Sequence, residues 1–270
     1  MKIGIISLGL IGGSLFKTLI KQGFNVHAVT RNETTINSVK KQTNNISKDL
    51  LSLSNCDVIF VCSPMNKTSI ILDELETIVS PNTIVADVCS LKKFINNKQR
   101  PYIFIGTHPM AGTENSGFEA SVEGLFNQAK WVITPFNKTP KEAIENLKTI
   151  IKATGAIPIE TTPEEHDVAV ALISHMPLIL SQALMETAGD NDLALKLAAS
   201  GFRDMTRLSL SNTEMANDML TLNTENIKES LISLKNNIDK ILESDYKQTA
   251  EIIKNKRQKL YNSDGKNIYN

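Results

Sequence analysis

The sequence predicts an α/β protein in which a doubly wound, mainly parallel sheet is followed by an all-helical part. Short apolar segments alternate with amphipathic helical stretches in the first part, which is the rhythm of parallel strands joined by crossover helices. The strand pattern then stops, and helical periodicity continues almost to the end. At 270 residues the chain also exceeds one typical domain.

These patterns place a domain boundary near residue 162. Strands are expected at 1–6, 25–29, 57–62, 83–87, 102–106, 131–134 and 157–159. Helices of the second part are expected at 164–188, 191–200, 213–221, 224–243 and 245–262. We therefore predict a sheet domain over residues 1–161 and a helical domain over residues 162–270.

The first expected strand runs directly into a glycine-rich turn over residues 7–13. A strand, a turn of small residues and a helix form the dinucleotide-binding fingerprint of a Rossmann-type sheet, in which backbone N–H groups approach a pyrophosphate. Ser7 stands where the fingerprint usually has its first glycine. An ordinary turn between a strand and a helix is the alternative. The residues expected to contact the cofactor here are Gly9, Leu10, Ile11 and Gly12.

The end of the second expected strand bears on the choice of cofactor. Thr30 and Arg31 stand where NAD enzymes usually carry an acidic side chain for the adenosine ribose, and no acidic residue occurs before Glu33. A hydroxyl and a guanidinium at this place suit a 2′-phosphate. NADP is therefore the predicted cofactor and NAD the alternative, while Arg31 as an ordinary surface cation is the competing interpretation. Ser63, which ends another strand at the same edge, is also expected to contact the cofactor.

Charge and cysteine content narrow the classes of partner. The 29 Lys and Arg residues balance 29 Asp and Glu residues, so no net charge favours nucleic acid or an anionic membrane. No signal segment is recognised and no apolar run reaches the length of a membrane span, so a cytoplasmic protein acting on a small molecule is expected. Cys56, Cys62 and Cys89 lie in or beside strands and are expected to be reduced core residues.

Two candidate catalytic side chains follow neighbouring strands of the predicted sheet. His108 comes after an apolar strand, with Pro109 fixing the turn and Gly112 leaving space for a ligand. Ser90 follows the strand at 83–87 and is expected to face the same crevice. An imidazole placed there can transfer protons. A structural loop histidine and a serine that caps a helix are the alternatives.

The other histidines receive different interpretations. His166 lies in an acidic first helical turn, where it is expected to cap or pair locally, and His27 lies within a strand and is expected to be structural. His175 precedes Pro177, which is expected to interrupt the long helix and to leave backbone groups exposed beside a site.

Two arginines follow an alanine-rich stretch of the second part. Arg203 and Arg207 are expected on a loop between helices, where a guanidinium suits a carboxylate substrate. A surface cation or a partner for Asp204 is the alternative, because exposed ion pairs are common and contribute little.

Taken in order, these motifs resemble those of the prephenate and arogenate dehydrogenases of tyrosine biosynthesis, over nearly the whole chain. The motifs lie at residues 8–14, 87–92, 108–114, 166–167, 174–177 and 201–207. The resemblance implies an oxidative decarboxylation in which NAD(P)⁺ takes hydride from the ring carbon that bears the hydroxyl. The ring loses its carboxyl group as CO2, and aromatisation drives the reaction forward.

The resemblance also implies roles for single residues. His108 accepts the proton of the ring hydroxyl as hydride departs, while Ser90 orients His108 and contacts the same hydroxyl. Arg207 binds a substrate carboxylate. His175 helps to close the substrate pocket, and further substrate contacts or gating are implied for Thr113 and Glu114. This chemistry requires no metal ion.

The resemblance is strongest to stand-alone, NADP-dependent arogenate dehydrogenases, so arogenate is the predicted substrate and prephenate the alternative. The helical domain of the family implies a homodimer, and apolar stretches at 178–180 and 231–232 agree with it, although they could instead form an internal core. A β-hydroxyacid dehydrogenase is disfavoured because no lysine occurs between Lys152 and Lys196. A non-catalytic, NADP-sensing protein is the remaining alternative.

Overall fold

The computed structural model describes residues 1–41, 43–113, 115–262, 265 and 267–268. The chain divides into two compact units, Met1–Thr224 and Glu225–Asn270. The predicted domain boundary at residues 161 and 162 lies inside the first unit and stays a prediction.

Within the described residues, the strands of the first unit form one eight-stranded sheet in the order β3-β2-β1-β4-β5-β6-β7-β8. The strands are β1 (Lys2–Ile6), β2 (Asn25–Val29), β3 (Ile46–Ser47), β4 (Val58–Val61), β5 (Ile84–Asp87), β6 (Ile103–Pro109), β7 (Lys130–Pro135) and β8 (Ile157–Glu160). Neighbouring strands run parallel except for β6 and β7. The predicted mainly parallel sheet is confirmed, and the two-residue strand β3 is an addition to it.

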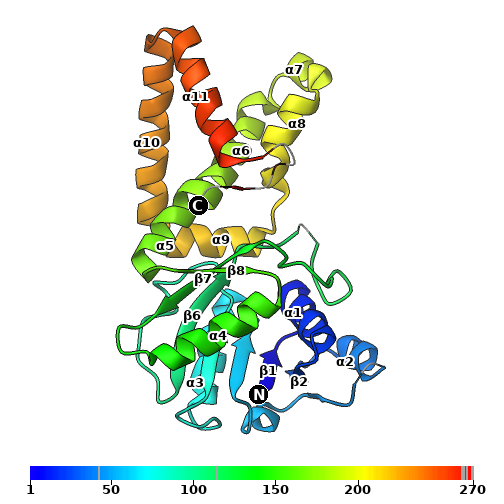
Figure 1. Cartoon of the computed structure of the whole chain (residues 1–270). Coiled ribbons are helices and arrows are strands. Elements are labelled where there is room, and N and C mark those ends of the chain that lie inside the picture. Colours follow the sequence, from blue (N-terminus) through cyan, green and yellow to red (C-terminus); the bar gives the residue numbers. More distant parts are fainter. Residues whose placement is uncertain (42, 114, 263–264, 266, 269–270) are drawn as a thin grey trace. The chain divides into compact units, whose positions relative to one another are not determined.

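Helices cover both faces of this sheet (Figure 1). The elements are α1 (Leu10–Lys21), α2 (Glu33–Lys40), the 3-10 turn η1 (Leu50–Leu53), α3 (Met65–Leu75) and α4 (Lys141–Ala153). Buried side chains of α1 and α4 belong to one apolar cluster, whereas Leu53 of η1 and Leu72 and Leu75 of α3 belong to another. Two clusters divided by a sheet are the signature of double winding, which confirms the predicted fold class. The largest buried side chain, Trp131, packs 4.9 Å from the ring centroid of Phe126.

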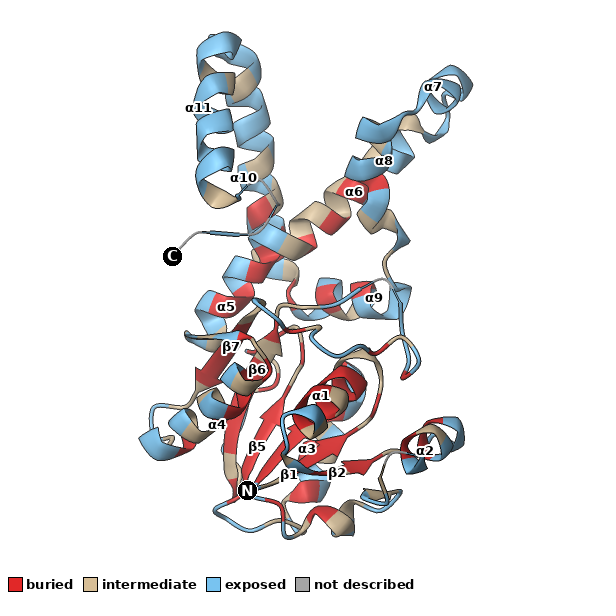
Figure 2. Ribbon diagram, turned by 45° about the vertical axis from the view of Figure 1, so that its right-hand side comes forward, coloured by how far each residue is buried: buried red, intermediate tan, exposed pale blue. Residues whose placement is uncertain are grey.

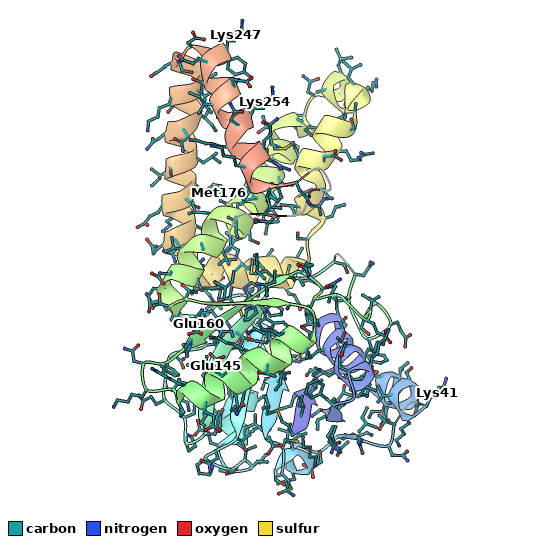
Figure 3. The ribbon with its side chains drawn as sticks, viewed as in Figure 1. Lys41, Glu145, Glu160, Met176, Lys247 and Lys254 are labelled. Carbon is teal, nitrogen blue, oxygen red and sulfur yellow. The ribbon has the colours of Figure 1, made fainter. Side chains whose placement is uncertain are left out.

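Surface charges add little to this packing. Lys148 of α4 lies 2.7 Å from a carboxylate oxygen of Glu145 and also contacts Glu160 of β8, and both carboxylates are labelled in Figure 3. Exposed ion pairs of this kind contribute about 0–1 kcal/mol each. The last strand is therefore held mainly by its ladder with β7 and by the apolar face of α4.

A helical segment completes the first unit. It contains α5 (Pro163–Val170), the π-helical turn η2 (Ala171–His175), α6 (Met176–Gly189), α7 (Asp192–Leu197), α8 (Ser200–Thr206), the 3-10 turn η3 (Arg207–Leu210) and α9 (Thr213–Leu222). Helix α5 begins with a capping box. The Thr162 side chain accepts a hydrogen bond from the backbone N–H of Glu165, and the Glu165 side chain accepts one from the backbone N–H of Thr162. The interruption expected beside Pro177 is confirmed as the π-helical turn, after which the proline lies in the first turn of α6.

Two expectations about this segment are wrong. Arg203, expected on a loop, lies in α8, because a single glycine costs a helix only about 1 kcal/mol and α8 packs against α6. The helical run Pro163–Gly189 is also long and apolar enough to cross a membrane by length and composition, although no such run was expected. Helix α5 continues through the π-helical turn into α6. Polar residues interrupt the apolar runs in the sequence here, but the helix itself is continuous, which is why the expectation failed. One such helix is weak evidence for a membrane, since core and interface helices meet the same criterion.

The second unit is a helical hairpin. Helices α10 (Thr224–Glu243) and α11 (Tyr246–Leu260) lie side by side in Figures 1 and 2, and both lie where they were expected. Asp245 caps α11 by accepting a hydrogen bond from Gln248 N at 3.3 Å.

Ser7 adopts a backbone conformation that favours glycine, with φ of 68°. Ser7→Gly is expected to raise the midpoint of thermal unfolding. A non-glycine residue in the left-handed region carries about 1–2 kcal/mol of strain, which exceeds the roughly 0.4–1 kcal/mol by which glycine stabilises the unfolded chain. Circular dichroism checks the shift. Ser69→Gly, within α3, is the matched control and should lower the midpoint, and a lower midpoint for Ser7→Gly would contradict the strain.

Candidate active site

The turn between β1 and α1 is shaped for close approach of a ligand. A Cβ added at Gly12 would lie 2.1 Å from the Ser7 carbonyl oxygen, so only glycine is accommodated there. A Cβ at Gly9 would meet none of the described atoms within 4 Å, which leaves the mouth of the turn open. Gly9 begins α1 without a side-chain cap, and the first turn carries no acidic residue. The N–H groups of this helix end are thus available to an anion such as a pyrophosphate, and the turn fits a dinucleotide.

The end of β2 presents a cation rather than a carboxylate. Arg31 is exposed directly after Thr30, and Asn32 caps α2 by accepting a hydrogen bond from Thr35 N at 2.9 Å. The first acidic residue that follows, Glu33, is paired with Lys48. The positive charge at the end of β2 is therefore suited to an additional phosphate group.

The serines at the ends of β4 and β5 are both engaged with α3. Ser63 Oγ lies 2.8 Å from Thr68 Oγ1, and Ser90 Oγ donates to the sulfur of Met65 at 3.8 Å. Ser90 was expected to orient His108, but its hydroxyl is directed to Met65 instead. The ring of His108 is held by another imidazole, that of His166. The expected contact between Ser90 and a substrate hydroxyl stays a prediction.

His108 is the next-to-last residue of β6, and it is half-buried at the carboxyl end of that strand. Its Nδ1 lies 2.9 Å from His166 Nε2, and the two rings meet edge to face. Burial holds the pKa of His108 well below its ordinary value of 6.5, and the charge of Lys92, like any positive charge on the neighbouring histidine rings, acts in the same direction. The ring is therefore neutral at physiological pH and can accept a proton.

His166 is joined to its neighbour Asp167 in the first turns of α5. The local pair expected from the sequence is confirmed by a distance of 2.8 Å between His166 Nδ1 and Asp167 Oδ1. The same carboxylate accepts hydrogen bonds from Lys92 N at 2.8 Å and from Lys93 N at 3.0 Å. The contact with His108 was missed by sequence reasoning. A His-Asp pair directly after the capping box of the first helix beyond the sheet was the available signal.

His175 lies at the end of the π-helical turn and is buried. Its Nδ1 lies 3.2 Å from Asn223 Nδ2, and the same amide nitrogen donates to the Asp167 carbonyl at 2.8 Å. Burial lowers the pKa of His175 to about 4, so this ring is also neutral near pH 7. His175 therefore belongs to the network around Asp167, while the expected role in closing a substrate pocket stays a prediction.

Other predicted substrate residues are not brought into contact with His108. Arg207 begins η3 and is exposed, and η3 is held on α6 by Ser209 N, which donates to Ser181 Oγ at 3.0 Å. Thr113 is exposed and accepts a local hydrogen bond from Asn115 N at 3.3 Å. Glu114 lies outside the described residues.

The chain resembles known proteins over both parts. The nucleotide-binding domain of prephenate dehydrogenase matches residues 16–160, and the prephenate dehydrogenase dimerization domain matches residues 162–259. Prephenate dehydrogenase of Bacillus subtilis is 32% identical over 249 residues, which are 87% of this chain and 67% of that protein.

Two solved structures superpose on this chain over nearly its full length. Synechocystis arogenate dehydrogenase superposes with a TM-score of 0.82 and 35% identity, covering 96% of this chain and 97% of the other. Prephenate dehydrogenase of Aquifex aeolicus, solved with hydroxyphenyl propionate and NAD⁺, gives a TM-score of 0.84 and 26% identity with the same coverage. Both domain matches follow one another in chain order, and a neutral imidazole lies at the sheet edge that carries the nucleotide turn. This chain belongs to the prephenate dehydrogenase family of NAD(P)-dependent oxidoreductases.

Proposed function

We propose that the protein converts arogenate to tyrosine by oxidative decarboxylation, with hydride transfer to NADP⁺. The observation that carries the proposal is the neutral imidazole of His108 at the carboxyl edge of a sheet whose first turn fits a dinucleotide. The choice of arogenate is supported by the likeness to Synechocystis arogenate dehydrogenase, which this chain covers by 97%.

The proposed chemistry assigns one task to each group. His108 accepts the proton of the ring hydroxyl, and Ser90 contacts that hydroxyl. The bound nicotinamide supplies the hydride acceptor. Arg207 pairs with a substrate carboxylate in a bidentate manner, while Thr113, Glu114 and His175 complete the substrate pocket. When CO2 leaves, the electron pair of the broken C–C bond makes the ring aromatic, and the proton held by His108 returns to the ring oxygen, which gives the phenol and restores the neutral imidazole.

The proposed dinucleotide site combines the open turn with the cation after β2. The N-terminus of α1 receives the pyrophosphate, and Thr30 and Arg31 receive the 2′-phosphate of NADP. The remaining proposed contacts are Gly9, Leu10, Ile11, Gly12 and Ser63.

Prephenate is the second candidate substrate, because the Bacillus subtilis and Aquifex aeolicus relatives are prephenate dehydrogenases. The two substrates differ only by an amine or a ketone on the side chain, so one or two pocket contacts decide between them. The test measures absorbance of the reduced cofactor with each substrate and each of NADP⁺ and NAD⁺. A higher kcat/KM with arogenate and NADP⁺ is expected. No turnover with either substrate would refute the proposed function.

The protonation state of His108 predicts the pH dependence of the reaction. A base must be neutral, so kcat/KM falls as pH drops through the pKa of His108, which is held well below 6.5. The profile is expected to stay level through neutral pH and to decline only well below pH 6.5. His108→Ala should lower kcat by about 10²–10⁴-fold and abolish this acid limb, with little change in cofactor affinity. A variant that keeps the wild-type kcat would remove His108 from its role as base.

Cofactor preference is predicted to depend on Arg31. Arg31→Asp places a carboxylate where the 2′-phosphate is proposed to bind, so the ratio of kcat/KM for NADP⁺ over NAD⁺ should fall by at least about tenfold. Lys41→Asp, which makes the same charge change just beyond α2, is the matched control. Equal ratios before and after the Arg31 change would exclude the phosphate contact.

We also propose that the protein is a homodimer. Helix α7 buries none of its residues against the described chain, and most of α7 and α8 is coloured as exposed in Figure 2. Both helices carry exposed apolar residues, among them Leu195 of α7 and Met205 of α8. Leu193 and Leu197 of α7 are 65% and 71% exposed. Exposed large apolar residues gathered on neighbouring helices are typical of an interface, and the match to a dimerization domain supports a second copy as the partner.

The paired change Leu193→Glu and Leu197→Glu is expected to convert the dimer to a monomer, because a buried, unpaired carboxylate opposes association. Light scattering coupled to size exclusion measures the mass. Leu51→Glu, at an exposed apolar position in η1, is the control and should leave the mass of the dimer unchanged. A doubly substituted protein that keeps the dimer mass places the interface elsewhere.

A further inference from the structure

The two ring nitrogens of His108 have different surroundings. Nδ1 lies 2.9 Å from His166 Nε2, whereas none of the residues that the structure describes forms a hydrogen bond with His108 Nε2. A neutral imidazole carries its single proton on one nitrogen and a lone pair on the other. A base needs the lone pair on the side of the substrate, so the position of this proton decides whether His108 can act.

Asp167 determines which nitrogen of His166 carries a proton. An ionised carboxylate only accepts hydrogen bonds, and Asp167 Oδ1 lies 2.8 Å from His166 Nδ1, so Nδ1 must donate. In neutral His166, Nε2 is then bare and can only accept. Because this nitrogen faces His108 Nδ1, the proton of neutral His108 must lie on Nδ1. His108 Nε2 is left with its lone pair.

The carboxylate that begins this chain of hydrogen bonds is firmly held. Lys92 N and Lys93 N donate to its two oxygens, at 2.8 and 3.0 Å, and the backbone carbonyl of Asp167 accepts from Asn223 Nδ2 at 2.8 Å. Asp167, His166 and Asn223 are all buried. A carboxylate with these partners cannot rotate away from His166 without leaving buried backbone donors unsatisfied, which is energetically unfavourable.

We infer that His166 and Asp167 are positioning residues that fix the tautomer of His108, so that Nε2 is the atom that receives the substrate proton. The inference rests on the proposed function. In that step the O–H bond of the hydroxyl breaks and an N–H bond forms at Nε2. The resulting imidazolium keeps its Nδ1–H bond to His166, and Asp167 stabilises the positive charge through the same hydrogen bonds. This is the task that a buried carboxylate performs for the histidine of a catalytic triad, with one imidazole added between them.

The tautomer can be read by ¹⁵N NMR of protein labelled at histidine, because protonated and bare ring nitrogens resonate at different positions. The chain has four histidines, and His108→Gln identifies the signals of His108. The His108 proton is expected on Nδ1 in the wild-type protein and no longer on one nitrogen alone in His166→Leu. A wild-type proton on Nε2 would overturn the inference. The measurement needs no substrate.

Kinetics separate positioning from packing. His166→Leu removes the acceptor that faces His108 Nδ1, whereas His166→Gln keeps an amide oxygen that can accept from it. For the leucine variant we expect kcat to fall by about 10²-fold or more, with KM changed by less than about threefold. The glutamine variant should recover at least about tenfold of that loss. His27→Gln, at a histidine of β2 outside the site, is the matched control and should keep the wild-type kcat.

Asp167→Asn tests the far end of the chain of hydrogen bonds and should lower kcat as His166→Leu does. Wild-type kcat in a folded His166→Leu protein would contradict the inference, and so would equal losses in the leucine and glutamine variants. If His166→Leu does not fold, the wild-type NMR spectrum and the glutamine variant still decide. If the wild-type protein oxidises neither arogenate nor prephenate, the proposed function fails, while the NMR result judges the tautomer separately.

Discussion

The carboxylate of Asp167 is the group on which the arrangement of the site depends. It binds two successive backbone N–H groups, those of Lys92 and Lys93, and thereby joins the first helix after the sheet to the loop after β5. Hydrogen bonds to a charged acceptor are stronger than neutral ones, and backbone donors are fixed in space. Because His166 precedes Asp167 in the same helix, α5 cannot dock on this loop without bringing that imidazole to His108. The fold and the geometry of the candidate base are therefore set by the same contact.

A fully buried ion pair fixes the other side of this loop. Lys92 Nζ contacts the carboxylate of Asp87 and donates to the Thr107 carbonyl at 2.5 Å, while Asp87 accepts from Thr107 N at 3.0 Å. Burying two charges costs several kcal/mol per ion, and the cost is offset only where the remaining hydrogen bonds are also made, as they are here. The pair holds the ends of β5 and β6 together immediately before His108. The charge of Lys92 also helps to keep the pKa of His108 low, so one side chain both places the candidate base and keeps it neutral.

Features set by short-range patterns could be predicted from the sequence, whereas contacts between distant segments could not. Strands, helices and the glycine turn follow from periodicity and residue size over a few positions, and most of them lie where they were expected, with α8 as an exception. The two-residue strand β3 is too short to show a period of two. His108 and His166 are 58 residues apart, and no local pattern separates a histidine that pairs only with its neighbour from one that also binds a second imidazole. For the same reason the engagement of Ser90 by Met65, across the edge of the sheet, was outside the reach of sequence reasoning.

The negative charge of the proposed substrate is expected to change the pKa of His108 when the substrate binds. Burial opposes protonation of this ring, and so does the positive charge of Lys92. A substrate that brings carboxylates into this region adds negative charge where the effective dielectric constant is low, which raises the pKa of the base. The strength of a general base rises with its pKa as long as it stays unprotonated. On the proposed function, His108 is therefore kept neutral in the free protein by burial and by the charge of Lys92, and it becomes a stronger base when the anionic substrate is bound beside it.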